Sequence, residues 1–320
     1  MLQHLILDTD IDTDCDDAGA LAVLHSLIGA GECDLLGVVC SVPIPACVGA
    51  VRAINAWYGR AALPVGLVVV PDYATAPSWR AYRAHHDSFL KPASGRDPYN
   101  VVLAKTRPAD DPEPEDAVRL YRRLLAGPPD RSVTICAIGT LTALAQLLAS
   151  RADELSPLPG RELVSRKVRE LVSMAAAPFP AGREVFNWSM DLPSAAGVIG
   201  AWPTALTVSP SGAAVLTGAR FVAAAPADHP VREAYVRHLL GGPDNNRSSW
   251  DLVAALYAVR GLSGPFALSA DRGLTLDPRT ADYRWQPAAG SAPPRRLVQP
   301  LLSDSDLAAI LEDLMMAPLK

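Results

Sequence analysis

The segment LILDTDIDTDCDDAGAL, residues Leu5–Leu21, contains an apolar run, six aspartates and the start of a helical pattern. Leu5–Leu7 is typical of a short buried strand. From residue 16 to residue 28 the apolar side chains recur at helical spacing, and Leu21, Leu24 and Ile28 fall on one face. The segment therefore predicts a strand that leads through an acidic loop into an amphipathic helix.

The same order of strand and helix recurs along the chain. Further strand candidates are Leu35–Val42, Pro64–Val70, Ser132–Ile138, Glu170–Ala176 and Thr207–Val208, and helix candidates are Ala46–Tyr58, Leu141–Ala149 and the region near Ser194–Ile199. This alternation is typical of βαβ units, so it predicts an α/β fold with a mainly parallel, Rossmann-like open sheet flanked by helices. In such sheets ligands bind beyond the carboxyl ends of the strands, so residues that follow a strand are the candidates for chemistry.

No internal repeat or clean boundary divides the chain, and we predict a single domain over residues 1–320. Residues 72–114 are polar and rich in Pro, Asp and Arg, which favours a long loop or lid over the end of the sheet. The last predicted helix covers Ser303–Met316, and Ser303 or Asp304 can cap it.

The composition predicts a folded protein with a large core. Of 320 residues 49% are hydrophobic, which excludes a disordered chain, and the net charge of −5 argues against nucleic acid as a partner. Five cysteines without a CxxC pair favour a reducing, cytoplasmic compartment. Ser132–Ser150 carries no charge, but Gly139 and Thr140 interrupt it, so we expect a buried strand and helix there rather than a membrane span.

The aspartates at positions 8, 10, 12, 14, 16 and 17 predict a metal site. Six carboxylates packed at one end of a sheet would repel one another unless a cation neutralised them. An all-oxygen set suits a hard ion such as Ca²⁺ or Mg²⁺. A solvated acidic turn with helix-capping aspartates would explain only one or two of the six.

Two other acidic loops can be tested against the same residues. An EF-hand loop needs Gly at its sixth position and Glu at its twelfth, and a loop that starts at Asp8 has Thr13 and Gly19 there. A loop that starts at Asp10 fails in the same way. A phosphohydrolase of the haloacid-dehalogenase type carries DxDx[TV], whose fifth position is an aspartate here, and this leaves a divalent-metal phosphohydrolase as a minor alternative.

The acidic segment resembles the N-terminal signature of the inosine-uridine-type nucleoside hydrolases, roughly DxDxGxDDAxAL. The matching residues are Asp8, Asp10, Asp16, Asp17, Ala18, Ala20 and Leu21, with two more residues between the aspartate pairs than the family pattern has. A competing register uses Asp10 and Asp12 as the first pair and needs no insertion. We prefer the first register because it leaves Leu5–Leu7 as the buried strand.

Three later segments support this resemblance in the right order. They are ICAIGTLTALA at Ile135–Ala145, FNWSMD at Phe186–Asp191, and the pair Trp250–Asp251 at the start of a late helix. They are similar to the family's G-x-LTN-x-A, EFN-x-x-x-D and HD segments. The resemblance covers residues 5–260 and implies a nucleoside-hydrolase-like fold and a homodimer or homotetramer.

The resemblance also implies a calcium-dependent cleavage of an N-glycosidic bond, which gives a free base and ribose. It implies Ca²⁺ ligands at Asp10, Asp17, Asp251 and the carbonyl of Ile138, with Asp10 as the general base. Asp16, Asn187, Glu184 and Trp250 would then contact the nucleoside. Whether Asp12 or Asp14 joins the metal shell stays open.

Several positions depart from the family pattern. Ala143 replaces the Asn of LTN, Val185 stands where a Glu is expected, with Glu184 one position earlier, and Trp250 replaces the His of the HD pair. An indole cannot give a proton to a departing base near neutral pH, although Trp250 could stack on a base or simply pack. A degenerate protein that binds a nucleoside or sugar without turnover is therefore the second hypothesis.

Three groups of polar residues lie outside these motifs. His85–His86 falls in the predicted lid and is either a surface pair or a substrate contact. Asn245–Arg247 precedes Trp250 and either lines the pocket or forms a solvated turn. Arg122–Arg123 is expected on the solvated face of a helix.

Overall fold

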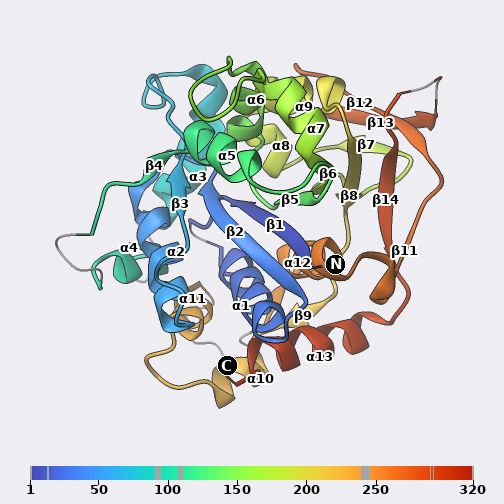
Figure 1. Ribbon diagram of the computed structural model, residues 1–320. Coiled ribbons are helices and arrows are strands. Elements are labelled where there is room, and N and C mark those ends of the chain that lie inside the picture. The colour runs from blue at the N-terminus through green and yellow to red at the C-terminus, as the bar shows by residue number, and fades with distance from the viewer. Residues whose placement is uncertain are drawn as a thin grey trace.

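Strand β1 (Gln3–Thr9) lies inside a large sheet in this computed structural model (Figure 1), which describes residues 2–12, 14–90, 95–106, 111–238, 246–288, 290 and 292–318. Within these residues the sheet has twelve strands, in the order β4-β3-β2-β1-β5-β6-β8-β14-β12-β13-β7, and β11 pairs with β14. Leu7 of β1 is flanked by Val38 of β2 and Cys136 of β5, and both pairings are parallel. The predicted mainly parallel sheet is confirmed.

The strands fall into two groups. The parallel group is β1, β2 (Cys33–Cys40), β3 (Val65–Leu67), β4 (Glu115–Asp116), β5 (Val133–Ala137), β6 (Val168–Met174), β8 (Ala205–Ser209) and β14 (Arg295–Pro300). The antiparallel group is β7 (Ala181–Arg183), β11 (Phe266–Leu268), β12 (Arg272–Leu276) and β13 (Asp282–Pro287). Outside this sheet, β9 (Leu216–Thr217) pairs with β10 (Arg247–Ser248).

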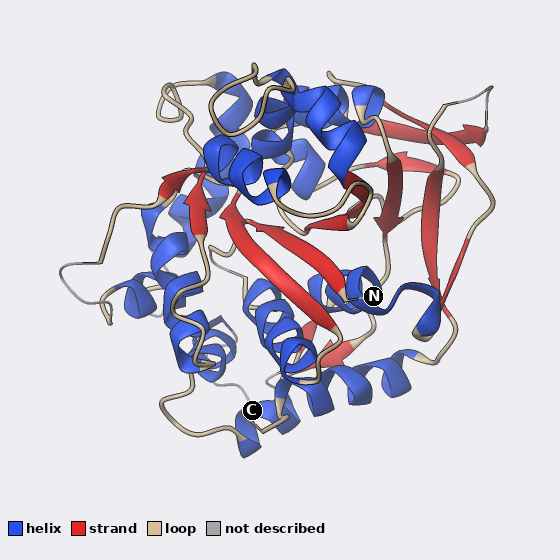
Figure 2. Ribbon diagram, viewed as in Figure 1, coloured by secondary structure: helices blue, strands red, loops and turns tan. Residues whose placement is uncertain are grey.

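Helices cover both faces of the sheet (Figure 2). Successive side chains of β1 point to opposite faces, so this strand contributes to the core on both sides. Leu5 and Leu7 belong to one hydrophobic cluster, and Ile6 belongs to the other. The first cluster includes side chains of α1 (Asp16–Gly29), α2 (Pro45–Trp57), α3 (Arg80–Leu90), α4 (Tyr99–Ala104), α10 (Ala219–Ala224), α11 (Pro230–His238), α12 (Trp250–Arg260) and α13 (Asp304–Met315). The second includes side chains of α5 (Ala117–Ala126), α6 (Thr142–Ala149), α7 (Gly160–Lys167), α8 (Asn187–Met190) and α9 (Leu192–Ala201). Short 3₁₀ turns occur at η1 (Pro77–Trp79) and η2 (Gly261–Ser263).

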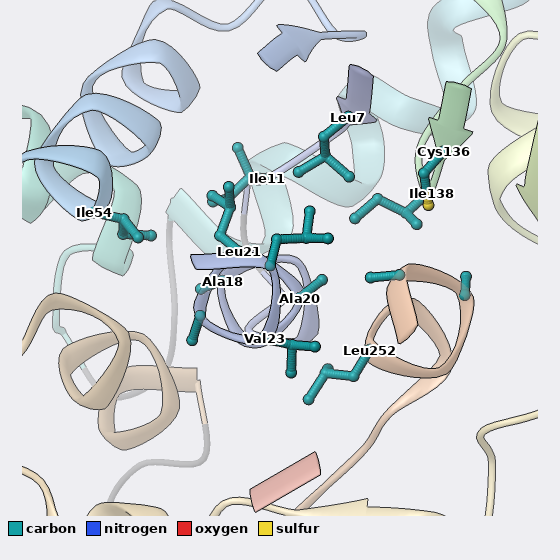
Figure 3. Packing of buried hydrophobic residues seen from close by; sticks show 14 of the residues in the cluster. Leu7, Ile11, Ala18, Ala20, Leu21, Val23, Ile54, Cys136, Ile138 and Leu252 are labelled. Atoms are coloured by element: carbon teal, nitrogen blue, oxygen red, sulfur yellow. The ribbon is translucent and has the colours of Figure 1, made fainter. Parts of the chain in front are cut away.

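Helix α1 packs closely against α12 (Figure 3), and this contact brings the first turns of the two helices together. Gly19 makes the approach possible, since a Cβ there would lie 2.6 Å from Tyr235 Oη and 2.9 Å from Leu252 Cδ1. Asp16 and Asp17 begin α1, and Asp251 is the second residue of α12. The packing of two apolar helices thus sets carboxylates from distant parts of the chain side by side.

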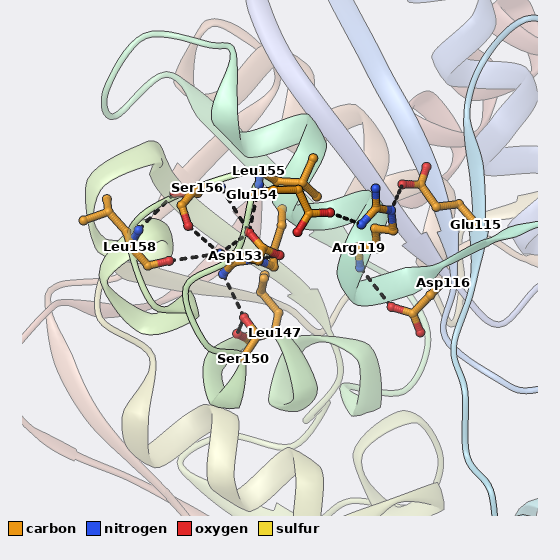
Figure 4. Close-up of polar contacts among 11 residues, drawn as sticks. Glu115, Asp116, Arg119, Leu147, Ser150, Asp153, Glu154, Leu155, Ser156 and Leu158 are labelled. Carbon is orange, nitrogen blue, oxygen red and sulfur yellow. Dashed lines mark hydrogen bonds and ion pairs between the residues drawn. The ribbon is translucent and has the colours of Figure 1, made fainter.

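Two local predictions from the sequence, the long loop and the solvated position of Arg122, are wrong. Residues 72–114 are not one long loop, because η1, α3 and α4 lie within them; residues 91–94 and 107–110 fall outside the described part. Arg122 is not on a solvated face but buried, and its guanidinium donates to Asp153 at 2.7 and 2.8 Å and to the carbonyl oxygens of Ser156 and Leu158. Figure 4 shows these acceptors, which secure the connection between α6 and α7. Ser303 caps α13 through the amide of Asp306, as expected.

In the part of the chain that the structure describes, none of the helices has both the length and the apolar character needed to cross a bilayer.

Candidate active site

The predicted site residues meet where β1 and β5 end and α1 and α12 begin. Asp10 follows β1, and its side chain is buried. Ile138 follows β5, and its amide donates to the carbonyl oxygen of Asp8 at 2.8 Å. These positions lie beyond the carboxyl ends of neighbouring parallel strands, where the fold class places ligands.

Gly139 allows these two strand ends to approach each other. A Cβ at this position would lie 2.5 Å from the main-chain nitrogen of Asp10 and 2.5 Å from Ser41 Oγ, both far closer than van der Waals contact. Any side chain at residue 139 would therefore push the turn after β5 away from Asp10. The glycine in the sequence GTLTA thus has a steric role in the site.

Three carboxylates form the centre of the cluster. Oxygen atoms of Asp16, Asp17 and Asp251 all lie within 4.8 Å of one another, and each of these residues is at most 5% exposed. Thr9 Oγ1 donates a hydrogen bond to Asp17. Burial raises the pKa of Asp10, Asp16, Asp17 and Asp251, and repulsion from neighbouring carboxylates raises each further.

This donor set fits a hard divalent cation. It consists of buried carboxylate oxygens from α1 and α12, and Asp10 lies near enough to repel both Asp17 and Asp251. A cation held among them would replace mutual repulsion with attraction, and oxygen ligands suit Ca²⁺ or Mg²⁺. Two of the predicted metal ligands, Asp17 and Asp251, therefore lie together with Asp16, which was predicted to contact the substrate, and Asp10 is a neighbouring charge.

Asp8 lies inside strand β1 rather than in this cluster. Its side chain is fully buried and accepts a hydrogen bond from Tyr121 Oη at 2.6 Å. Burial raises its pKa to about 7, although the hydrogen bond from Tyr121 opposes the shift. Tyr121 comes from α5, so Asp8 joins the strand to that helix.

Asp12 is directed at the predicted lid. Its carboxylate accepts hydrogen bonds from Tyr82 Oη at 3.2 Å and Asn100 Nδ2 at 2.7 Å, and it lies 2.6 Å from His86 Nδ1. Both oxygens of Asp12 are therefore engaged by side chains of α3 and α4. The sequence analysis singled out His86 only as part of the pair His85–His86. It did not predict that Tyr82 or Asn100 would bind Asp12.

Asp14 faces the opposite side of the acidic loop. Arg247 donates from Nε to both oxygens of Asp14, at 2.9 and 3.1 Å, and also from Nη2. His238 Nε2 lies 3.4 Å from the same carboxylate. Arg247 begins β10 and is described, whereas Asn245 lies outside the described residues.

Asn187 and Glu184 hold main-chain groups beside the cluster. Asn187, at the start of α8, is buried, and its Nδ2 donates to the carbonyl oxygens of Ile138 at 2.9 Å and Met174 at 3.1 Å. The two oxygens of Glu184 accept from the amides of Ala176 and Phe186, at 2.7 and 3.2 Å. These contacts bring the ends of β5 and β6 together with α8.

Trp250 is half-buried next to Asp251 at the start of α12. The guanidinium carbon of Arg247 lies over its indole, 5.0 Å from the ring centroid. His85 of α3 meets Phe186 edge to face, with centroids 4.9 Å apart. Aromatic and cationic side chains therefore surround the carboxylate cluster.

A family model matches this chain in sequence, and solved structures resemble it in fold. The sequence model described as inosine-uridine preferring nucleoside hydrolase matches residues 5–270, and no curated protein matches the chain. The effector protein XOO4466 is similar in structure, with a TM-score of 0.71 and 16% identity over 98% of this chain and 93% of that one. The type III effector XopQ, solved with adenosine diphosphate ribose, has a TM-score of 0.70 and 16% identity over 98% and 94%. A purine-preferring ribonucleoside hydrolase from Gardnerella vaginalis has a TM-score of 0.69 and 13% identity over 98% of both chains.

Proposed function

The chain belongs to the family of inosine-uridine preferring nucleoside hydrolases and is an N-glycosyl hydrolase, and we propose that it releases base and ribose from a ribonucleoside or a related N-riboside in a calcium-dependent reaction. The observation that carries the proposal is the buried group of Asp16, Asp17 and Asp251 at the start of α1 and α12. The neighbour solved with adenosine diphosphate ribose supports including ribose-containing ligands other than nucleosides.

Asp10, Asp17, Asp251 and the carbonyl oxygen of Ile138 would hold the ion. When bound, Ca²⁺ would lower the pKa of a coordinated water and orient the hydroxyl groups of ribose. The crowding of buried carboxylates supports this assignment, since they need a neutralising cation. Neither Asp12 nor Asp14 is assigned to the ion, because both are engaged by protein donors.

The remaining roles follow from position. Cleavage passes through an oxocarbenium-like state at the anomeric carbon, and Asp10 would take the proton of the attacking water as general base. Asp16 and Asn187 would bind ribose hydroxyls, and Glu184 would also contact the substrate. These contacts would hold the anomeric carbon over the water. Trp250 would lie on the side of the departing base, where its indole could stack on a flat ring.

We further propose that residues 72–114 form a lid on this site and that the whole chain is one domain. The bonds from α3 and α4 to Asp12 support the lid. Family resemblance supports a homodimer or homotetramer, which size-exclusion chromatography with light scattering can test. Five free, buried cysteines support a reducing compartment such as the cytoplasm.

The decisive experiment incubates the protein with inosine, uridine and p-nitrophenyl riboside, with and without Ca²⁺, and measures free ribose together with the leaving group, which is the base of each nucleoside or the p-nitrophenol of the riboside. We expect release of both products, and loss of release with a chelator. Asp10→Asn should lower kcat by ~10²–10⁴-fold at full metal content, the usual contribution of a general base. The exposed Asp313→Asn is the control and should behave as the unmodified protein.

Two further outcomes separate the alternatives. Asp17→Ala and Asp251→Ala should each lose bound calcium, as measured by calorimetry; full metal content in both would overturn the ligand assignment. Tight binding of a ribonucleoside with no release of base or ribose over long incubation would instead identify a degenerate binding protein. Release of inorganic phosphate from a phosphomonoester would favour the phosphohydrolase alternative.

A further inference from the structure

Arg247 connects the acidic loop to the start of α12, and it lies 233 residues from Asp14 in the sequence. On one side its Nε and Nη2 donate to the carboxylate of Asp14, in the loop between β1 and α1. On the other side its guanidinium lies over the indole of Trp250, 5.0 Å from the centroid. A single planar group therefore joins the acidic loop to the first residue of α12.

The geometry of the guanidinium makes this connection directional. Nε and Nη2 form the edge that a carboxylate binds in a bidentate manner, and the same plane presents its flat face to an aromatic ring. Because Asp14 holds the edge, the angle of the guanidinium over Trp250 is set by the acidic loop. Nη1 takes no part in the ion pair with Asp14.

Partial burial strengthens the contact between the Arg247 guanidinium and the Trp250 indole. Side chains of Arg247 and Asp14 are 30% and 26% exposed, so both are shielded from much of the solvent. His238 Nε2 also lies 3.4 Å from Asp14. A partly desolvated cation over an indole is worth more than the same pair on an open surface.

Asp14 lies between the two aspartate pairs that match the family signature, and this arrangement explains what it does. Its two oxygens accept from Arg247, so its charge is compensated without the metal. The main-chain nitrogen of Cys15 also donates to Asp14, at 2.7 Å, which fixes the carboxylate in the turn just before α1. The loop therefore carries a rigid anchor two residues from Asp16.

We propose that Arg247, anchored by Asp14, is a specificity-determining positioning residue that fixes the indole of Trp250 as the wall against which the departing base packs. This inference rests on the proposed function, which puts the base on the side of Trp250. Arg247 acts through Trp250 and does not contact the reacting atoms. Its loss should therefore affect ligands that carry a base and spare ligands that consist of the sugar alone.

The test compares inosine, which has a flat base, with D-ribose, which has none. Arg247→Gln and Asp14→Asn should raise the KM for inosine about tenfold, the scale of one lost cation–π contact, with a smaller change in kcat. The inhibition constant of D-ribose and the calcium affinity should change less than twofold. Arg247→Lys keeps the charge but lacks the planar bidentate edge, so its KM for inosine should stay close to that of Arg247→Gln.

Arg220→Gln is the matched control, because Arg220 also pairs with carboxylates, Glu312 and Asp313, but on α10. It should leave the KM for inosine unchanged. Equal losses for inosine and D-ribose, or full rescue by Arg247→Lys, would overturn the positioning role. If Arg247→Gln fails to fold, Arg247→Lys and Asp14→Asn still decide the question.

These outcomes are distinct from a failure of the proposed function. An unmodified protein that hydrolyses no riboside and binds neither inosine nor D-ribose removes both proposals. An unmodified protein that hydrolyses inosine, with the same KM in Arg247→Gln, removes only the role of Arg247.

Discussion

Asn187 Nδ2 donates a hydrogen bond to the carbonyl oxygen of Ile138 at 2.9 Å, which joins the start of α8 to the turn after β5. The same amide group donates to the carbonyl oxygen of Met174, at the end of β6. A residue that resemblance assigns to the sugar therefore also orients the carbonyl that we assign to the metal. A carbonyl oxygen has two lone pairs, so it can accept this bond and still face a cation.

We predict that Asn187→Ala weakens calcium binding as well as substrate binding. The variant leaves the carbonyls of Ile138 and Met174 without this donor. Loss of a group that orients a metal ligand typically costs ~10–100-fold in metal affinity. Calorimetric titration with calcium measures the effect. Ser189→Ala is the control, because Ser189 lies in the same helix as Asn187 and its hydroxyl donates to the carbonyl of Phe186 instead. An Asn187→Ala protein with unchanged calcium affinity would limit Asn187 to the sugar.

Asp12 gives a prediction for the lid. Asn100 is fully buried, and its Nδ2 provides one of the bonds that hold α4 to the acidic loop. Asn100→Ala removes this donor from a buried carboxylate, a change that typically costs ~1–3 kcal/mol or more. We expect faster hydrogen exchange in residues 80–90 and 95–104. Asp97→Asn removes only an exposed ion pair with Lys105 and should leave exchange unchanged. Equal exchange in Asn100→Ala and the unmodified protein would show that Asp12 does not hold the lid.

The sequence predicted the parts of the fold and site that depend on local pattern. Apolar periodicity located β1 and α1, and the order of strands and helices predicted a mainly parallel sheet. The strands β11–β13 escaped prediction because they are short and polar on one side, and their place depends on pairing with β14 and with each other. The buried role of Arg122 was missed for a related reason, since the acceptors at residues 153, 156 and 158 lie beyond the next helix.

Within the site, the sequence pattern likewise could not predict the tertiary contacts of Asp12 and Asp14. Periodicity showed that Asp12 and Asp14 lie in the loop after β1, but it could not show their partners. His86 and Arg247 meet these carboxylates only through the tertiary arrangement of α3 and β10. The question of whether Asp12 or Asp14 joins the metal shell could therefore be addressed only from coordinates.

His25 predicts a pH dependence of stability that does not involve the active site. It is 1% exposed, its Nε2 lies 2.9 Å from Asn55 Oδ1, and its ring stacks on Tyr58 with centroids 4.5 Å apart. Burial lowers the pKa of His25 to about 4, although the hydrogen bond with Asn55 opposes the shift. The unfolded chain therefore takes up this proton first, and the stability that His25 provides above pH 6.5 is lost as the pH falls toward 4.

The measurement is the free energy of unfolding at pH 7 and pH 5, in the unmodified protein and in His25→Gln. Protonation of His25 in the unfolded chain should lower the free energy of unfolding by about 2 kcal/mol between pH 7 and pH 5. This contribution should be absent from the His25→Gln variant. Other titrating groups, including the carboxylate cluster, are common to both proteins and cancel in the difference. An identical pH dependence in the two proteins would contradict the lowered pKa of His25.

Trp250 predicts an unusual order of substrates. The family pattern has an imidazole here that can give a proton to the departing base, whereas an indole can donate a hydrogen bond but not a proton near neutral pH. The rate of cleavage should therefore fall most for substrates whose base is a poor leaving group. It should fall least for substrates whose leaving group departs as a stable anion. Stacking on the indole would compensate in part by holding a flat base, worth ~1–3 kcal/mol in other contacts between bases and aromatic side chains.

We therefore expect slow cleavage of inosine and uridine and faster cleavage of p-nitrophenyl riboside. The test compares kcat/KM for the three substrates in the unmodified protein and in Trp250→His, which should narrow the gap by improving the ordinary nucleosides. If the unmodified protein cleaves inosine as fast as the activated riboside, a different group must protonate the base. His85 and His86 are then the first candidates, because α3 carries both and His86 is already held beside the acidic loop by Asp12. In that case Trp250 would serve the site by packing alone, and Trp250→His would change the KM without changing the order of the substrates.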